Sequence, residues 1–236
     1  ESKAEYPVLM RKPWNAKMTG LLSVNTMAEF VSLVKQIMKA STSKTEKITA
    51  PAVLALVGPS GSGKREITEA LCSRGTGASE RTESGEIFVR PVNYCTEPGR
   101  YGHKYVPEEA FDRMNFFEKT AYAGVRYGTR KEDIQTLLDQ GKFAVIPVDM
   151  CGAIAMKRSF PTHIIYVARD KEKLIADIID SDYDTEEKTL RILSIDAEKR
   201  NRKICDYVIH NDTIEGERVS GAEEIRRLIL LEGEKY

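Results

Sequence analysis

The stretch Gly58-Pro59-Ser60-Gly61-Ser62-Gly63-Lys64-Arg65 decides the fold that this sequence predicts. An unbroken apolar run, residues 52–57, precedes it and predicts a buried strand, and residues 66–72 predict a helix. A glycine-rich turn ending in lysine between a strand and a helix is typical of a phosphate-binding loop, or P-loop. We therefore expect residues 58–65 to bind nucleotide phosphates, with Lys64 reaching the terminal ones. A glycine-rich turn without a ligand is the alternative.

The residue after the lysine departs from the usual loop. Ser or Thr normally follows, and its hydroxyl binds Mg²⁺, but Arg65 stands here. The loop motif makes ATP or ADP the expected ligand. The missing hydroxyl puts a role for Mg²⁺ in doubt. The four cysteines and three histidines lack ligand spacing, so that we expect no resident metal site.

The composition narrows the function classes. The 236 residues suffice for one α/β domain with an appendage. The net charge of zero gives no reason to expect nucleic acid as a partner. No apolar run approaches the ~20 residues of a membrane helix, and scattered cysteines without a C-x-x-C pair favour a reducing, cytoplasmic setting. Because the chain begins at Glu1, a longer parent chain remains an alternative.

Residues 1–50 read as an N-terminal arm, an amphipathic helix and a linker, and residues 51–236 as the main domain. We expect Trp14 to anchor the arm on that domain, with docking of a protein partner as the alternative. A capping box at residues 26–29 opens the helix. Its apolar side chains recur at helical spacing and predict packing on the main domain, or else contact with another chain. They are Met27, Phe30, Val31, Val34, Ile37 and Met38.

Apolar strands alternate with helices along the rest of the chain, which predicts an α/β fold with a parallel sheet covered on both faces. Strands are expected at 86–92, 116–118, 124–128, 143–148, 164–167 and 207–209. Helices are expected at 107–114, 129–138, 171–179, 186–203 and 220–231. We expect Thr129 to cap its helix. The helix 186–203 is expected to carry Leu190, Leu193 and Ala197 on one face.

Four further stretches, in this order, resemble the guanylate kinase family over residues 51–232. They are Thr96-Glu97-Pro98-Gly99-Arg100, Phe117-Glu118 through Thr129, Asp149-Met150-Cys151-Gly152-Ala153, and Cys205 through Asp212. The loop with Arg65-Glu66 is also similar to the kinase-like domain of leucine-rich-repeat guanylate-kinase proteins. The resemblance implies a P-loop nucleoside-monophosphate-kinase fold, with an acceptor subdomain at 87–130 and a lid at 180–190.

The resemblance also implies roles for single residues. Lys64, Arg100 and Arg191 would be catalytic. Ile192 stands at a position where the family has an arginine, and Arg191 is the residue beside it. Arg100, Tyr127 and Asp149 would bind the acceptor nucleotide.

Several positions depart from the family pattern. Glu97 stands where the family has an arginine that grips phosphate, and a carboxylate there repels it. Ala121 and Arg130 replace guanine contacts, and Pro147 replaces an aspartate near the metal. The lid stretch 180–184 is acidic where the family places arginines.

These departures favour a nucleotide-binding or scaffolding module with little kinase activity, whose protein partner would use the arm, its helix or the degraded acceptor cleft. The alternatives are an active nucleoside-monophosphate kinase with altered acceptor choice and a structural domain without nucleotide.

Overall fold

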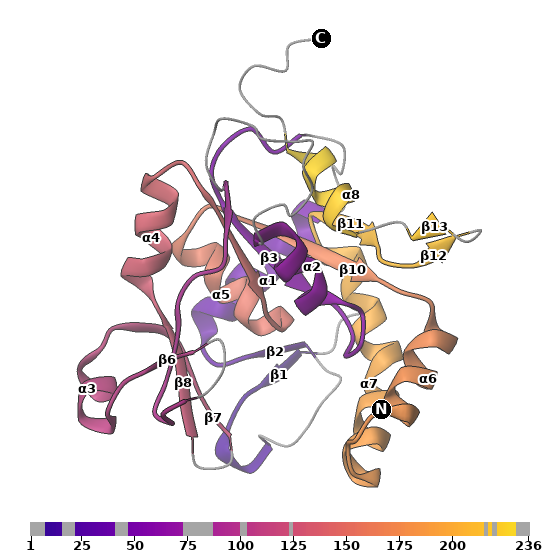
Figure 1. Ribbon diagram of the computed structural model, residues 1–236, viewed down its shortest axis with the longest axis horizontal. Coiled ribbons are helices and arrows are strands. Elements are labelled where there is room, and N and C mark those ends of the chain that lie inside the picture. Colours follow the sequence, from indigo (N-terminus) through magenta and orange to yellow (C-terminus); the bar gives the residue numbers. More distant parts are fainter. Residues whose placement is uncertain are drawn as a thin grey trace.

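A five-stranded parallel sheet forms the centre of the computed structural model (Figure 1). The strand order is β11 (Tyr207–His210), β10 (Thr162–Ala168), β3 (Val53–Val57), β9 (Phe143–Pro147) and β4 (Phe88–Val89). The structure describes residues 8–15, 22–40, 47–72, 87–99, 103–122, 125–214, 217–218 and 221–229. The α/β fold with a parallel sheet is therefore confirmed.

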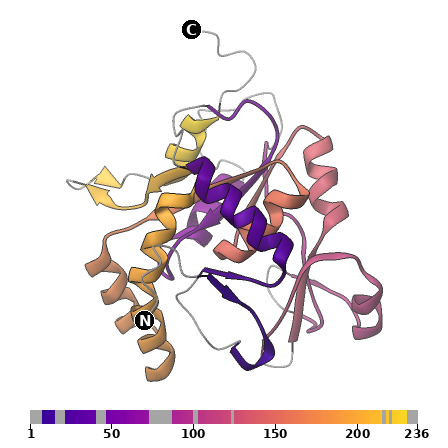
Figure 2. The same cartoon turned by 180° about the vertical axis from the view of Figure 1, so that it is seen from behind.

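Helices cover both faces of this sheet. Successive side chains of a strand point to opposite faces, and every side chain of β3 is therefore buried. Leu54 and Leu56 pack against α2 (Lys64–Cys72) and α8 (Gly221–Leu228). Val53, Ala55 and Val57 belong to the core on the other face. That core is covered by α1 (Met27–Ala40), α4 (Lys131–Asp139) and α5 (Met150–Ser159). Figures 1 and 2 show α2 and α1 on opposite sides of the sheet.

A second sheet stands beside the first in the order β6 (Lys104–Tyr105), β5 (Asn93–Cys95), β8 (Val125–Arg130) and β7 (Phe116–Tyr122). Helix α3 (Glu108–Arg113) packs on it through a small core of Tyr94, Phe111 and Phe116. The expectation that Thr129 caps a helix is wrong. Thr129 pairs with Asn93 inside the sheet, and Arg130 is the residue that precedes α4.

Helices α6 (Lys171–Asp180) and α7 (Thr185–Arg200) form an antiparallel pair at one end of the molecule (Figure 1). The side chains of Asp170 and Asp184 accept backbone N–H bonds and cap the two helices. The expected apolar face of α7 is only partly right, because Leu193 is 71% exposed and Leu190 41%. Ile195 instead carries the packing against α6. The short helix η2 (Asn201–Ile204) follows α7, and the two-stranded sheet β12 (Thr213–Ile214) and β13 (Glu217–Arg218) precedes α8.

The N-terminal arm forms a small ribbon that sequence periodicity did not indicate. Strand β1 (Val8–Met10) pairs in parallel with β2 (Leu22–Val24), and the 3-10 helix η1 (Pro13–Asn15) lies between them in sequence. Leu22 and Val24 are buried in the main core, so that the ribbon is part of the domain. Trp14 does not anchor it, since its side chain is 82% exposed.

Helix α1 packs on the domain, but through a different set of residues than its apolar periodicity predicts. The expected cap is present, because Thr26 Oγ1 accepts the Glu29 N–H, while the Glu29 carboxylate reaches one residue further back than in a regular capping box and accepts the Asn25 N–H. Leu33 and Gln36 are buried. Ile37 is partly buried against the core, whereas most of the predicted face is exposed. The exposed members are Met27, Phe30, Val31, Val34 and Met38. None of the helices within the described ranges combines the length and the apolar character that a bilayer span requires.

Candidate phosphate site and acceptor pocket

The P-loop leaves the end of β3 and enters α2 through three glycines with positive φ, namely Gly58, Gly61 and Gly63 at 143°, 80° and 91°. A Cβ on Gly58 would lie 2.7 Å from the Val167 carbonyl oxygen, and one on Gly63 would lie 1.9 Å from Asn211 Nδ2. Gly58 therefore requires glycine for space as well as for conformation, whereas a Cβ at position 63 would force the Asn211 amide to move. The loop takes this shape because neighbouring strands approach it closely.

Side chains from the two strands beyond β3 hold the back of the loop. Asn211, just after β11, donates from Nδ2 to the Ser62 carbonyl oxygen at 3.1 Å. Arg169, just after β10, donates to the Gly61 carbonyl oxygen at 2.6 Å and forms an ion pair with Asp177 of α6 at 2.6 Å. The loop is thus tied both to the sheet and to the α6–α7 pair.

Lys64 begins α2 and turns back over the loop. Its Nζ donates to the carbonyl oxygens of Gly58 at 2.5 Å and Pro59 at 2.8 Å. Burial lowers the pKa of its ammonium, and the carboxylates of Glu198 and Glu66 partly oppose that shift. The lysine therefore sits in the loop as a desolvated cation, whose carbonyl contacts a phosphate oxygen can replace.

A cavity of about 500 Å³ opens in front of the loop. Its walls come from the P-loop, from the segment after β9, from α7 and η2, and from the N-terminal ribbon. The lining includes Arg11, Ser23, Gly58, Ser60, Lys64, Pro147, Asp149, Arg191, Glu198 and Asn201. Three cations and two carboxylates line it, which leaves one excess positive charge. The volume and the charge suit phosphate groups.

Arg191 is the only one of the three predicted catalytic residues besides Lys64 that the structure describes, and the fold brings it to the loop. Its guanidinium donates to Ser60 Oγ. It also pairs with Glu187 at 2.6 Å and lies 3.9 Å above the Tyr183 ring. Tyr183 belongs to the acidic stretch after α6, so this stretch helps to hold the arginine in place. Arg100 lies outside the described residues.

Sequence reasoning missed Glu198, although a signal existed, because it follows Arg191 by seven residues and so shares its face of α7. Burial raises the pKa of the Glu198 carboxyl, and the Lys64 ammonium opposes that shift. Glu198 Oε1 accepts a hydrogen bond from Ser194 at 3.0 Å. Glu198 therefore brings a carboxyl group close enough to Lys64 for each to affect the pKa of the other.

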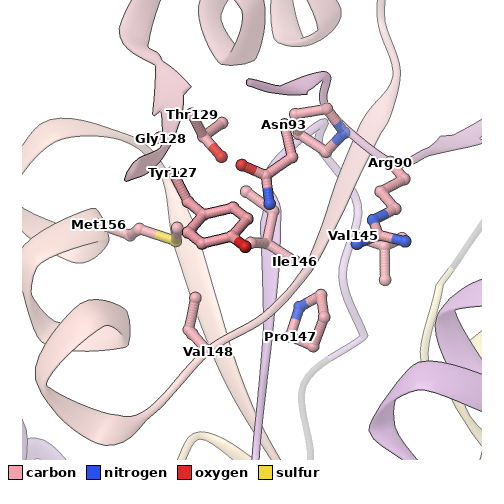
Figure 3. Close-up of a pocket in the computed structure, with 11 residues that line it drawn as sticks. Arg90, Asn93, Tyr127, Gly128, Thr129, Val145, Ile146, Pro147, Val148 and Met156 are labelled. Atoms are coloured by element: carbon pink, nitrogen blue, oxygen red, sulfur yellow. The ribbon is translucent and has the colours of Figure 1, made fainter. Parts of the chain in front are cut away.

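Tyr127 and Asp149, the two residues predicted to bind the acceptor that the structure describes, lie in two different cavities. Tyr127 lines a smaller cavity of about 140 Å³ between the two sheets, where its ring lies between Met156 and the Asn93 amide (Figure 3). Asp149 lines the larger cavity and accepts the Gly152 N–H at 2.7 Å, capping α5. Pro147 and Val148 line both cavities. The structure thus places two neighbouring cavities on either side of the end of β9.

The positions that depart from the family pattern take up other tasks. Arg65 is exposed and is absent from the lining of the large cavity. Glu97 is exposed, and Arg130 forms an ion pair with Asp133 at 2.5 Å. Pro147 brings a ring without oxygen to the cavity. In the described part of the chain, no three His, Cys, Asp or Glu side chains gather into a cation site.

Comparison with known proteins locates these features in a family. The Guanylate kinase family model matches residues 50–225. A guanylate kinase of Chlamydia trachomatis serovar D is 27% identical over 195 residues, covering 77% of this chain and 88% of that protein. The mouse leucine-rich repeat and guanylate kinase domain-containing protein is 27% identical over 154 residues, which are 62% of this chain and 18% of that protein.

A solved structure was also matched. The crystal structure of guanylate kinase from Anaplasma phagocytophilum aligns with a TM-score of 0.46 at 18% identity, covering 78% of this chain and 85% of that one. The family model matches more than half of this chain, including the whole P-loop and the strands and helices that hold it. This chain therefore belongs to the guanylate kinase family.

Proposed function

We propose that this guanylate-kinase-like domain binds the phosphates of ATP or ADP at its P-loop and transfers phosphoryl groups poorly, acting as a nucleotide-binding or scaffolding module. The observation that carries the proposal is the convergence of Lys64 and Arg191 on one cavity at the loop. Two cations beside a P-loop supply the positive charge and the N–H donors that bind nucleotide phosphates. A protein partner at the arm, its helix or the acceptor cleft stays a prediction.

The residues around the cavity fit Mg²⁺ poorly, which supports the second half of the proposal. The usual hydroxyl after the loop lysine is replaced by Arg65, whose side chain is exposed. Pro147, which lines the cavity, also has no side-chain oxygen that could bind the ion. Mg²⁺ neutralises the charge that develops during phosphoryl transfer. A site that holds Mg²⁺ poorly therefore lowers the rate of transfer more than the affinity for the nucleotide.

Calorimetric and thermal-shift titrations with ATP, ADP and GMP, each with and without Mg²⁺, test the proposal. At 100 times its Kd, ATP should stabilise the chain by about 2.7 kcal/mol, or roughly 5–10 °C in Tm. Lys64→Ala should abolish that shift. Lys131→Ala is the matched control, because Lys131 also opens a helix, is exposed and does not line the cavity. We expect removal of Mg²⁺ to change the affinity for ATP little.

Two results would contradict the proposal. If wild-type chain shows no shift with any nucleotide, the domain is structural. If Lys131→Ala loses as much as Lys64→Ala, the shift does not come from the P-loop.

An active nucleoside-monophosphate kinase is the second candidate, and the arrangement of the two cavities favours it. The large cavity at the loop and the smaller one with Tyr127 meet at Pro147 and Val148, as donor and acceptor sites must. A coupled assay of ADP formation with a panel of nucleoside monophosphates separates the two candidates. Steady turnover with any acceptor would replace the first proposal by the second.

A further inference from the structure

The N-terminal ribbon brings a residue into the phosphate cavity from outside the part of the chain that matches the family. Arg11 lines the cavity together with Ser60, Lys64 and Arg191, although it is 53 positions from Lys64 in sequence. The family match begins only at residue 50. In Figures 1 and 2, β1 and β2 lie between the α6–α7 pair and the second sheet. Arg11 therefore reaches this cavity from outside the residues that the family model matches.

The backbone places Arg11 firmly. Its N–H donates to the Val24 carbonyl oxygen at 2.8 Å, which continues the β1–β2 pairing by one residue. Val24 is only 1% exposed and packs in the core together with side chains of α5. On the other side, Asn15 Nδ2 donates to the Met10 carbonyl oxygen at 2.9 Å and its Oδ1 accepts the Lys12 N–H. The Arg11 side chain thus starts from a fixed point on the wall of the cavity.

We propose that Arg11 is a third phosphate-contacting residue and that the ribbon supplies it to the polyphosphate chain of the bound nucleotide. With Arg11, the cavity holds three cations against Asp149 and Glu198. Without Arg11 the two remaining cations are matched by two carboxylates, so that the lining has no net positive charge to attract an anion. A guanidinium also offers paired N–H donors that match two phosphate oxygens. Ser23, buried on the same ribbon, adds a hydroxyl to this wall.

The inference rests on the proposed nucleotide binding, and calorimetry with ATP and with inorganic tripolyphosphate tests the two separately. Arg11→Gln should weaken the binding of both ligands by about tenfold, the loss expected for one charged hydrogen-bonded contact. The factor should be the same for both, because the contact is to phosphate and not to the base. Arg11→Lys keeps the charge but loses the fork, and should weaken both by a smaller factor.

Lys12→Gln is the matched control, since Lys12 is the next residue, carries the same charge and is exposed outside the cavity. It should leave both affinities within twofold. If Arg11→Gln binds as tightly as wild type while Lys64→Ala does not bind, the role of Arg11 is refuted and the proposed function stands. Equal losses in Arg11→Gln and Lys12→Gln would also refute it, because they indicate a general charge effect. If wild type binds neither ligand, both proposals fail. If Arg11→Gln folds poorly, Arg11→Lys takes its place in the titrations, because its backbone anchor and charge are unchanged. Unchanged affinity of Arg11→Lys for both ligands would then refute the role of the guanidinium fork.

Discussion

Gly63 is the residue at which the P-loop depends most directly on a distant part of the chain. Asn211 approaches so closely that any side chain at position 63 would overlap its amide, at 1.9 Å from the Cβ position. The same amide donates to the Ser62 carbonyl oxygen. A β-carbon would therefore displace the side chain that holds the loop closed from behind.

We expect Gly63→Ala to destabilise the fold by about 2–4 kcal/mol and to abolish the thermal shift with ATP. Left-handed backbone costs a β-carbon ~1–2 kcal/mol, and the displaced Asn211 amide adds the loss of a buried hydrogen bond. Urea unfolding and ATP titration measure the two effects. Gly99→Ala is the matched control, because Gly99 has φ of 76° but nothing within 4 Å of the added carbon. Gly99→Ala should lower the free energy of unfolding only by the cost of the left-handed backbone. Equal losses of stability in both variants would show that the contact with Asn211 does not matter.

At the scale of elements, one carboxylate joins two helices to the sheet. Asp206 forms an ion pair with Lys157 of α5 at 2.6 Å and accepts the Ile164 N–H of β10 at 2.8 Å. It also accepts from Gln36 of α1 at 3.1 Å. Burial acts to raise the pKa of Asp206, but the Lys157 ammonium and these hydrogen bonds outweigh it and lower the pKa. Asp206 therefore fixes where α1 and α5 lie against the sheet.

We expect Asp206→Asn to lower the free energy of unfolding by about 2–3 kcal/mol at pH 7, since it leaves the Lys157 ammonium without its counter-ion. Because the pKa of Asp206 is lower in the folded than in the unfolded state, its carboxylate stabilises the fold at pH values above the unfolded pKa of about 4. This contribution is lost as the pH falls through the folded pKa. The deficit of the variant should therefore shrink at pH 3. Urea unfolding at both pH values measures it.

Asp196→Asn provides the comparison for that variant. Asp196 pairs with Lys171 at 2.8 Å on the surface, where screening leaves such a pair little effect on stability. It should unfold as wild type does at both pH values. An undiminished deficit of Asp206→Asn at pH 3 would show that the effect is not the charge of the carboxylate.

At the scale of the whole molecule, the N-terminal ribbon is part of the core and part of the site. Its residues Leu22 and Val24 are buried in the main core, and Val8 and Met10 pack against the same core. The ribbon also closes one wall of the phosphate cavity through Arg11 and Ser23. The stability of the domain and the shape of its site are therefore coupled through this segment.

We expect removal of residues 1–24 to lower the free energy of unfolding by about 3–6 kcal/mol, because the buried apolar side chains of Leu22 and Val24 are lost and the core residues that they contact become exposed. Starting at Asn25 keeps the capping box of α1. Trp14→Ala should change the stability by less than ~0.5 kcal/mol, since that side chain lies in solvent. Urea unfolding compares the three chains. A truncated chain as stable as wild type would mean that the ribbon does not belong to the core.

The sequence by itself determined the P-loop, the parallel sheet and the family, because these depend on local signals. The apolar run 52–57, the spaced glycines and Lys64 predict a strand, a turn and a helix from residues that are neighbours in the chain. The structure has β3 and α2 at that place.

Only the tertiary structure decided which side of α1 is buried and which residues complete the cavity. Periodicity identifies an apolar face, yet α1 buries the polar Gln36, whose amide reaches the Ile204 carbonyl oxygen and Asp206, about 170 positions away. Arg11 and Glu198 come to line the cavity at the loop through the same kind of long-range packing. Such contacts depend on how distant segments fill space and satisfy one another's polar groups, and no local pattern records them.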